Sequence, residues 1–176
     1  MRAYPHEYSS DFTMHNGEQV TIRPIRPDDE SLMVAFHKEL SEHSVYMRYG
    51  NASTLSFRTA HERLTQVCFI DYDREMALVA KNVDCGIIGV GRLIKDRAQN
   101  AAEFALVVAD KYQTLGLGGE LLHRVLTIAR QEGLESVYGF ILPDNPRMQS
   151  LARELGFSLE FPSDGGLIEA RLQISK

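Results

Sequence analysis

Residues 107–122 read VVADKYQTLGLGGELL, and this stretch decides the fold. It begins as an apolar, β-branched strand, passes through a loop with three glycines, and enters a helix with an apolar face. The N-terminus of a helix presents free backbone N–H groups and the positive end of the helix dipole. Glycines let a ligand approach the main chain closely. The stretch therefore predicts a binding site for a phosphate or pyrophosphate.

Two common phosphate-binding motifs do not fit this loop. The run GLGG at 116–119 lacks the last, spaced glycine of GxGxxG, and no P-loop Lys-Ser/Thr pair follows it. Taken alone, the loop is explained equally well as a plain strand-to-helix turn whose glycines serve packing. A mononucleotide-binding domain is a less favoured alternative, because neither a lysine nor a magnesium ligand follows the glycines.

Around this stretch, hydrophobic periodicity predicts a single α+β domain. Strands are expected at 19–24, 76–81, 86–94, 102–109, 136–142, 157–161 and 167–174. Helices are expected from 28 to about 40 and at 44–49, 56–66, 118–132 and 146–155. Gly89 and Gly91 inside a strand indicate a bulge or a close approach of another backbone. The first residues are polar and aperiodic, so we expect an N-terminal extension over 1–17 and the domain over 18–176.

The composition is ordinary for a globular protein and narrows the choice of partners. With a net charge of -5 and a pI of about 5.7, the chain has no basic field for nucleic acid. It has neither a run of about 20 apolar residues nor a signal-like N-terminus, so we expect a cytoplasmic location and no membrane partner. Cys68 and Cys85 lie in apolar surroundings without a CxxC pattern, and we expect buried, reduced thiols.

Three signatures follow one another along the chain. They are IRPIRPDD at 22–29, QTLGLG at 113–118, and DNPRM at 144–148 with LGF at 155–157. The second matches the Q/R-x-x-G-x-G/A pattern of the GNAT acetyltransferase superfamily, and over about residues 18–174 the chain resembles that superfamily. The resemblance implies an α+β GNAT fold: a mixed, mostly antiparallel central sheet of about seven strands, flanking helices and a splayed cofactor-binding strand.

More narrowly, the chain is similar to the GNAT domain of bacterial protein-lysine acetyltransferases. The supporting segments are 22–29, SVYMRY at 44–49, AEFA at 102–105 and 144–148. Some of those proteins carry the domain after an acyl-CoA synthetase-like region. No such region is present in this sequence, so we expect a stand-alone version.

The resemblance implies acetyl-CoA as co-substrate and assigns residues to it. Amides of the 113–119 loop would bind the coenzyme A pyrophosphate. The backbone groups of Leu106 and Val108 would pair with the pantetheine arm, which would lie beside them like an extra strand. An amide near Val108 would also hold the thioester oxygen. Asn145 would cap the last helix and contact the arm, although a capping role alone is the alternative. The cofactor-binding set is Leu106, Val107, Val108, Gln113, Thr114, Leu115, Gly116, Leu117, Gly118, Gly119 and Asn145.

Glu103 is the candidate general base. A lysine amine with a pKa near 10.4 is only about 0.04% neutral at pH 7, so a base is useful. Glu103 lies in an apolar strand, where desolvation would raise its pKa, although an ordinary exposed strand carboxylate is the alternative. In many family members, a Tyr seven residues after the Asn is the general acid that protonates the departing thiolate. Here that position is Ala152. Tyr138 is a distant candidate for the acid, and we expect it to be a core aromatic residue.

The expected reaction is direct transfer of an acetyl group from acetyl-CoA to a primary amine in a ternary complex. A protein lysine is the leading acceptor; a small-molecule amine and a weakly catalytic acyl-CoA-sensing module are the alternatives. His61-Glu62 has no second His at zinc-site spacing, so no metal is expected. His37 and His43 are expected on helix surfaces. A monomer and a homodimer are both compatible with the sequence.

Overall fold

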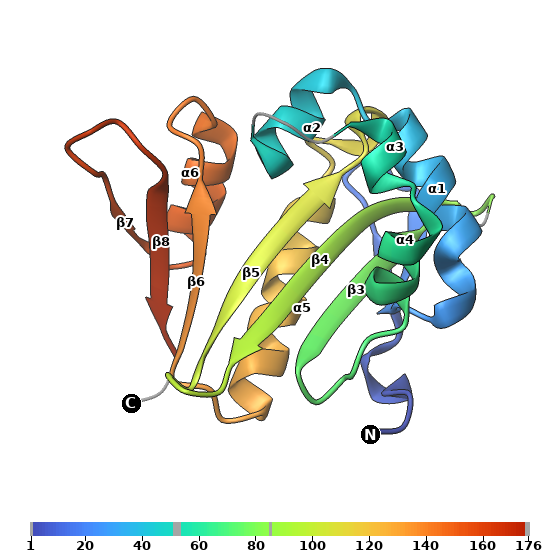
Figure 1. Cartoon of the computed structure of the whole chain (residues 1–176), viewed down its shortest axis with the longest axis horizontal. Helices are drawn as coiled ribbons and strands as arrows, with labels where there is room; N and C mark the ends of the chain where they lie inside the picture. Colours follow the sequence, from blue (N-terminus) through green and yellow to red (C-terminus); the bar gives the residue numbers. More distant parts are fainter. Residues whose placement is uncertain (1, 51–53, 85, 175–176) are drawn as a thin grey trace.

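The computed structural model of the chain describes residues 2–50, 54–84 and 86–174. Within them, one eight-stranded sheet runs in the order β1-β2-β3-β4-β5-β6-β8-β7 (Figure 1). Neighbouring strands are antiparallel except β5 and β6, which are parallel. The strands are β1 (Ser10–Thr13), β2 (Gln19–Pro24), β3 (Glu75–Lys81), β4 (Ile87–Asp96), β5 (Ala101–Val108), β6 (Ser136–Ile141), β7 (Ser158–Glu160) and β8 (Ile168–Gln173). The α+β class and the mostly antiparallel sheet are confirmed.

Helices cover both faces of this sheet. They are α1 (Glu30–Glu39), α2 (Glu42–Tyr49), α3 (Leu55–Arg58), α4 (His61–Cys68), α5 (Leu117–Gln131) and α6 (Pro146–Glu154), with single 3-10 turns η1 (His6–Tyr8), η2 (Pro27–Asp29) and η3 (Asp110–Tyr112). Figure 1 shows α5 and α6 behind the sheet and α1, α3 and α4 in front of it. The core lies between these layers.

Helix α5 packs directly on the backbone of β4. A Cβ atom at Gly91 would lie 3.3 Å from the Cβ of Leu121, and one at Gly89 would lie 3.1 Å from the Leu121 side chain. The expectation that these strand glycines mark a close approach is therefore confirmed. The contact fixes the position of α5, and with it the loop that precedes the helix.

Two elements differ from those expected. Residues 10–13 form an additional edge strand, β1, which pairs with β2 and raises the number of strands to eight. The single helix expected at 56–66 is two short helices, α3 and α4. The break follows Thr59, whose hydroxyl donates a hydrogen bond to the Leu55 carbonyl (2.8 Å) and so closes the first helix locally.

The N-terminal extension is packed against the domain. Tyr4 Oη donates a hydrogen bond to the Pro24 carbonyl (2.7 Å). The His15 N–H donates to the Leu115 carbonyl (2.9 Å), and Arg124 Nη1 of α5 donates to Ser10 Oγ (2.7 Å). The extension is thus bonded both to the glycine loop and to the helix that follows it.

Strands β5 and β6 pair only at their first residues. Ala101–Glu103 lie beside Ser136–Tyr138, and beyond Glu103 the strands diverge (Figure 1). The Phe104 ring lies against Gly139 at this point, because a Cβ atom on Gly139 would sit 2.4 Å from the ring. Phe104 also packs edge-to-face on Phe157, with ring centroids 5.2 Å apart. This divergence is the splayed strand that the resemblance implied.

Cys68 is fully buried at the end of α4, and burial raises the pKa of its thiol to about 11. The expectation of a buried thiol is confirmed for Cys68, whereas Cys85 lies outside the described residues. Of the helices in the described parts of the chain, none has the length and apolar character needed to cross a membrane.

Candidate active site

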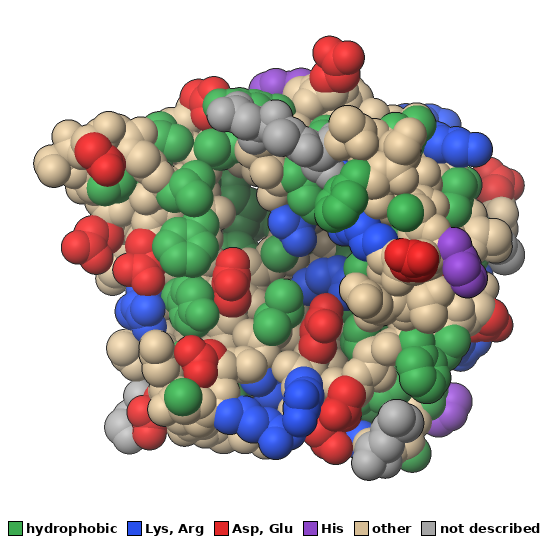
Figure 2. All heavy atoms as spheres, viewed as in Figure 1, with side chains coloured by type: hydrophobic (Ala, Val, Ile, Leu, Met, Phe, Trp, Pro, Cys, Tyr) green, Lys and Arg blue, Asp and Glu red, His purple; other side chains and the backbone are tan. Residues whose placement is uncertain are grey.

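A cleft of about 720 Å³ opens where β5 and β6 separate. The divergent part of β5 forms one wall, residues 140–148 form the other, and α2 contributes residues 43–49 to the lining. Figure 2 shows this face hollowed between its two halves, with basic side chains on the floor of the hollow. The lining includes Glu103, Thr114, Gly118 and Asn145. The cleft therefore brings the glycine loop and the candidate base into one space.

The glycine loop presents an unbroken run of open amides. The six N–H groups from Thr114 to Gly119 have no hydrogen-bond partner among the residues that the structure describes. The chain is left-handed at Thr114 (φ 65°) and at Gly116 (φ 86°). Alternation of left- and right-handed residues turns successive amides toward a common point and makes an anion-binding concavity, here reinforced by the N-terminus of α5. This geometry fits a pyrophosphate.

Gln113 differs from the rest of the loop, because it joins the elements around the cleft. Its own N–H donates to the Asp110 carbonyl (3.3 Å) and is not one of the open amides. Its Nε2 donates to Ser44 Oγ and to the Val108 carbonyl (both 3.0 Å), and its Oε1 accepts from Arg147 Nη1 (2.9 Å). The Gln113 side chain therefore links α2, β5 and α6.

The backbone of β5 faces the cleft at alternate residues. The Ala109 N–H donates to the Ile88 carbonyl (2.8 Å), which sets the phase of the β4–β5 ladder. Hydrogen-bonded pairs alternate in antiparallel sheets, so the amides of Leu106 and Val108 point away from β4, toward the gap, and that of Val107 points toward β4. The Val108 carbonyl also points toward the gap and accepts a hydrogen bond from Gln113 Nε2. The Val108 N–H faces the cleft.

Three other predicted cofactor residues lie in different surroundings: the core, the N-terminal extension and the start of α6. Leu117 is buried in the core, and Gly116 lies under the His15 ring, since a Cβ atom there would sit 2.5 Å from His15 Nε2. Asn145 caps α6, because its Oδ1 accepts a hydrogen bond from the Met148 N–H (3.1 Å). The expected capping role of Asn145 is confirmed, and the residue also lines the cleft.

Glu103 is half-buried in β5, opposite Ile94 of β4 and beside Tyr138 of β6. Directly opposed residues share a face of the sheet, so Glu103 and Ala105 lie on the same face as Arg92, the partner of Ala105. Glu103 thus lies on the face that α1 and α4 cover, and it is the last residue of β5 that pairs with β6 before the two strands diverge.

Neither position considered for the general acid, Ala152 or Tyr138, lines the cleft. Ala152 is fully buried in α6 and presents nothing to the cleft. The expectation that Tyr138 is a core residue is wrong: it is half-buried, and Arg171 stacks on its ring at 5.0 Å. Burial and then the nearby Glu103 carboxylate raise the pKa of the Tyr138 phenol.

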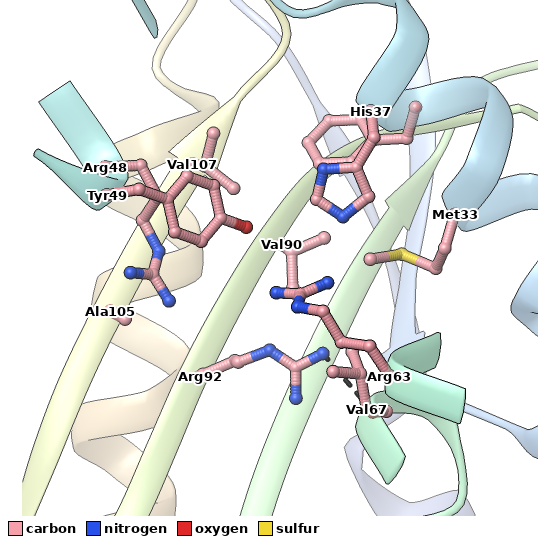
Figure 3. Close-up of a pocket in the computed structure, with 11 residues that line it drawn as sticks. Met33, His37, Arg48, Tyr49, Arg63, Val67, Val90, Arg92, Ala105 and Val107 are labelled. Atoms are coloured by element: carbon pink, nitrogen blue, oxygen red, sulfur yellow. Dashed lines mark hydrogen bonds between the residues drawn. The ribbon is translucent and has the colours of Figure 1, made fainter. Parts of the chain in front are cut away.

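A cluster of basic side chains lies beside the cleft and was not predicted from the sequence. Arg48 of α2, Arg63 of α4 and Arg92 of β4 line a cavity of about 20 Å³ together with His37 of α1. Figure 3 shows the three guanidinium groups turned toward one space, with His37 at one end of it. No sequence spacing connects these residues, because each comes from a different element.

His37 was expected on a helix surface, and that expectation is wrong, whereas His43 is exposed as expected. Only 2% of His37 is exposed, and neither ring nitrogen has a hydrogen-bond partner among the described residues. Burial, followed by the charges of Arg63, Arg58, Arg92 and Arg48, lowers the pKa of His37 to about 4. The signal was present in the sequence, since His37 follows Met33 and Phe36 at the spacing of a buried helix face.

In the described part of the chain, no group of three or more His, Cys, Asp or Glu side chains lies where it can hold a metal ion. The site instead consists of open amides at a helix N-terminus, an unpaired strand edge and a carboxylate in the same cleft. A sheet that parts beside such a loop defines the class of acyl-CoA-dependent N-acyltransferases.

The chain belongs to the GNAT acetyltransferase family. The family described as "Acetyltransferase (GNAT) domain" matches residues 19–158. The chain is 30% identical to acetyltransferase PA5475 of Pseudomonas aeruginosa over 149 residues, which cover 82% of this chain and 78% of that protein. It is 27% identical to acetyltransferase Pat of Mycolicibacterium smegmatis over 147 residues, and the match covers 81% of this chain but only 42% of Pat.

Solved structures show the same fold. The GNAT domain of PAT from S. lividans superposes with a TM-score of 0.87 at 22% identity, covering 97% of this chain and 99% of that domain. The PaiA N-acetyltransferase of Thermoplasma acidophilum, solved in complex with coenzyme A, superposes with a TM-score of 0.71 at 18% identity, covering 88% and 98% of the two chains. The protein is an acyl-CoA-dependent N-acetyltransferase.

Proposed function

We propose that this enzyme transfers the acetyl group of acetyl-CoA to a primary amine by direct attack in a ternary complex, with Glu103 as the base. One observation carries the proposal: Thr114 and Gly118 of the loop with open amides and Glu103 line the same cleft. The cleft is large enough to hold a coenzyme arm and an acceptor together. A direct attack then requires no covalent intermediate on the protein.

We assign the parts of acetyl-CoA to successive parts of the cleft. The amides of Thr114 through Gly119 and the N-terminus of α5 bind the pyrophosphate. The backbone of Leu106 and the Val108 N–H bond the pantetheine arm in the place of a neighbouring strand. Asn145 caps the helix on the opposite wall and contacts the arm. Acetyl-CoA supplies the activated acyl carbonyl.

The residues of the chain supply base and electrostatic functions. Glu103 removes a proton from the ammonium group, directly or through a water, and so produces the neutral amine that attacks. The Val108 N–H donates to the carbonyl oxygen as negative charge develops there. Because Ala152 is apolar and buried, no side chain of α6 protonates the leaving thiolate at that position, and solvent provides the proton.

A protein lysine is the acceptor we propose. Support comes from the similarity to the Pat proteins in sequence and fold and from the exposed apolar side chains at the rim of the cleft, Phe140 and Leu167, which are 50% and 52% exposed. Large apolar side chains at a rim favour an acceptor with a surface of its own. A cytoplasmic setting for this reaction remains the prediction of the sequence.

The variant Glu103→Gln tests the proposal. It keeps the size of the side chain but removes the base, so we expect turnover to fall on the order of 10²–10⁴-fold. Stabilisation of the folded protein by acetyl-CoA, measured as a shift in melting temperature, should remain, while ATP should give no comparable shift. Glu160→Gln on β7 is the matched control, because Glu160 is exposed and lies outside the cleft lining.

Turnover that survives in Glu103→Gln would remove this residue from the mechanism. Absence of turnover with all amines in the parent enzyme, combined with a large acetyl-CoA shift, would instead favour the acyl-CoA-sensing module. The position of Ala152, where a Tyr acid is expected in the family, is the observation that keeps this second function in consideration.

A further inference from the structure

The cavity beside the cleft concentrates positive charge. Arg48, Arg63 and Arg92 converge on it, and Glu75 is the carboxylate that pairs with one of them, through Arg92 Nη1 (2.7 Å). Arg63 donates to the Arg58 carbonyl (3.0 Å) and Arg92 to the Val67 carbonyl (3.3 Å), which orient the groups without neutralising them. The overall charge of the chain is negative, so this local excess is a feature of the cavity and not of the composition.

Arg48 is the least engaged member of the cluster. Its guanidinium lies 4.7 Å from the centre of the Tyr49 ring and makes no hydrogen bond or ion pair within the described residues. Burial is the main cause that lowers the pKa of Arg48. Tyr49 and the Glu103 carboxylate act in the opposite direction, whereas the charges of Arg92 and Arg63 lower the pKa further. A half-buried guanidinium with unused donors costs free energy unless an anion accepts from it.

His37 provides a second, independent indication of a ligand. Its ring is 98% buried at one end of the cavity, and neither nitrogen has a partner among the described residues. A buried imidazole that lacks partners is rare in native structures, and a ligand is one of its ordinary explanations. The neutral ring carries one N–H donor, which suits an anionic oxygen held by the neighbouring guanidinium groups.

The cavity adjoins the cleft that Glu103 lines. Arg48, Tyr49, Ala105 and Val107 line both spaces. Its volume of about 20 Å³ accommodates one small group such as a water or an anionic oxygen. An acceptor that places its amine at Glu103 can therefore extend a short acidic group into the cavity.

We propose that Arg48, Arg63, Arg92 and His37 bind a carboxylate of the acceptor, so that the enzyme selects amines that carry an acidic group on the same molecule. The inference rests on the proposed function for the amine half of the site. The anion-binding half stands on the cavity itself. Two sources share this chemistry: an acidic residue near a lysine in a peptide, and the carboxylate of a free amino acid.

The register of the sheet favours an acceptor whose amine and carboxylate are several bonds apart. Ala105, opposite Arg92, lies two residues from Glu103 on the same face, which is roughly 7 Å along the strand. An α-amine and its own carboxylate share one carbon and do not span this distance. The ε-amine of lysine, with an acidic group elsewhere in the molecule, does.

Matched acceptors test the inference through kcat/KM. Blocked lysine peptides with Glu one or two residues before or after the lysine are compared with the same peptides carrying Gln, and free lysine is compared with lysinamide. We expect the carboxylate form of at least one pair to react tenfold faster or more, the usual value of a hydrogen bond to a charged group. The pair that responds identifies the source. Equal rates within every pair would overturn the inference.

Arg48→Gln shows whether the cluster causes the preference. The variant removes a group without hydrogen bonds to described residues, so the fold should tolerate it, and it should abolish most of the discrimination. Arg74→Gln is the control, because it changes net charge equally at a residue whose side chain is 73% exposed and lies outside the cavity lining. A preference that persists in Arg48→Gln would exclude the cluster as its origin.

A binding measurement separates this inference from the proposed function. Glutarate, compared with sodium chloride at equal ionic strength, should raise the melting temperature of the parent protein and raise it less in Arg48→Gln and Arg63→Gln. A glutarate shift without turnover on any amine would support the anion site while the acetyltransferase proposal fails. Turnover without carboxylate preference and without a shift would leave the proposed function intact and overturn the anion site.

Discussion

Gly116 is the residue on which the shape of the glycine loop depends. Its φ of 86° lies in the left-handed region, and a Cβ atom would sit 2.5 Å from His15 Nε2. We therefore expect Gly116→Ala to lower the free energy of unfolding by about 1–2 kcal/mol or more and to raise the KM for acetyl-CoA. Urea denaturation and initial rates at varied acetyl-CoA measure the two effects.

The control for Gly116 is Gly133→Ala, at the end of α5. Gly133 has a similar φ of 74°, but a Cβ atom there would meet nothing within 4 Å. Its replacement should cost stability through backbone strain alone and leave the KM for acetyl-CoA unchanged. A Gly116→Ala protein with an ordinary KM would show that the loop geometry does not matter for coenzyme binding.

His37 makes the stability of the fold depend on pH. Burial and the surrounding Arg63, Arg58, Arg92 and Arg48 lower its pKa to about 4, against 6.5 in the unfolded chain. As pH falls from 6.5 to 4, His37 becomes protonated in the unfolded chain but stays neutral in the folded protein. The free energy of unfolding should therefore decrease across this window, by up to about 3 kcal/mol from this group, with no further loss below it.

Comparison with His37→Leu isolates this contribution. The leucine variant should lose less stability than the parent between pH 6.5 and 4 in parallel urea titrations, because carboxylates titrate in both proteins. Identical pH profiles would contradict the lowered pKa of His37.

Single residues differ in how far their roles can be read from the sequence. The loop glycines and Asn145 belong to local motifs, so the left-handed turn at Gly116 and the cap of α6 by Asn145 can be anticipated from neighbouring residues. Arg48, Arg63 and Arg92 come from three elements, and their proximity exists only after the sheet and helices have packed. The expectation for Tyr138 was wrong because alternation along a strand does not reveal where the neighbouring strand diverges from it.

At the scale of elements, the contact between Phe104 and Gly139 accompanies the parting of β5 and β6. A Cβ atom on Gly139 would lie 2.4 Å from the Phe104 ring, which is itself held against Phe157. We expect Gly139→Ala to lower the free energy of unfolding by about 1–3 kcal/mol through overpacking and to change the KM for acetyl-CoA. Denaturant midpoints and KM values that match the parent would show that the ring moves without cost.

Elements with strong periodicity were predicted, and weak ones were not. Helix α5 and strands β3–β6 bury a continuous apolar face, which leaves a clear pattern. Strand β1 contains one apolar residue, Phe12, in the four-residue edge strand SDFT, and its pairing with β2 supplies what its sequence does not show. The split between α3 and α4 depends on a single hydroxyl bond from Thr59.

For the whole molecule, the N-terminal extension is the part whose removal is most informative. Deletion of residues 1–17 removes the bond from His15 to Leu115 and the anchor of Arg124 on Ser10. We expect a lower melting temperature and a KM for acetyl-CoA raised several-fold, since a loop held by about one fewer net hydrogen bond is less well ordered. A truncated protein that melts and binds like the parent would limit the functional unit to 18–176.

The order of motifs was sufficient to predict the architecture of the molecule, because each signature lies at a junction between elements. The cavity that we propose for an acidic group of the acceptor was not predictable in the same way. Its lining comes from α1, α2, α4, β4 and β5, so no single segment encodes it.

The short contact between β5 and β6 also determines how the molecule loosens. Within the described sheet, three residue pairs join the β1–β5 part to the β6–β8 part. Local opening should follow this seam at a lower free energy than global unfolding. A ligand that forms hydrogen bonds with both β5 and β6 adds contacts where the sheet has the fewest. Binding of that ligand should therefore raise the free energy of this local opening.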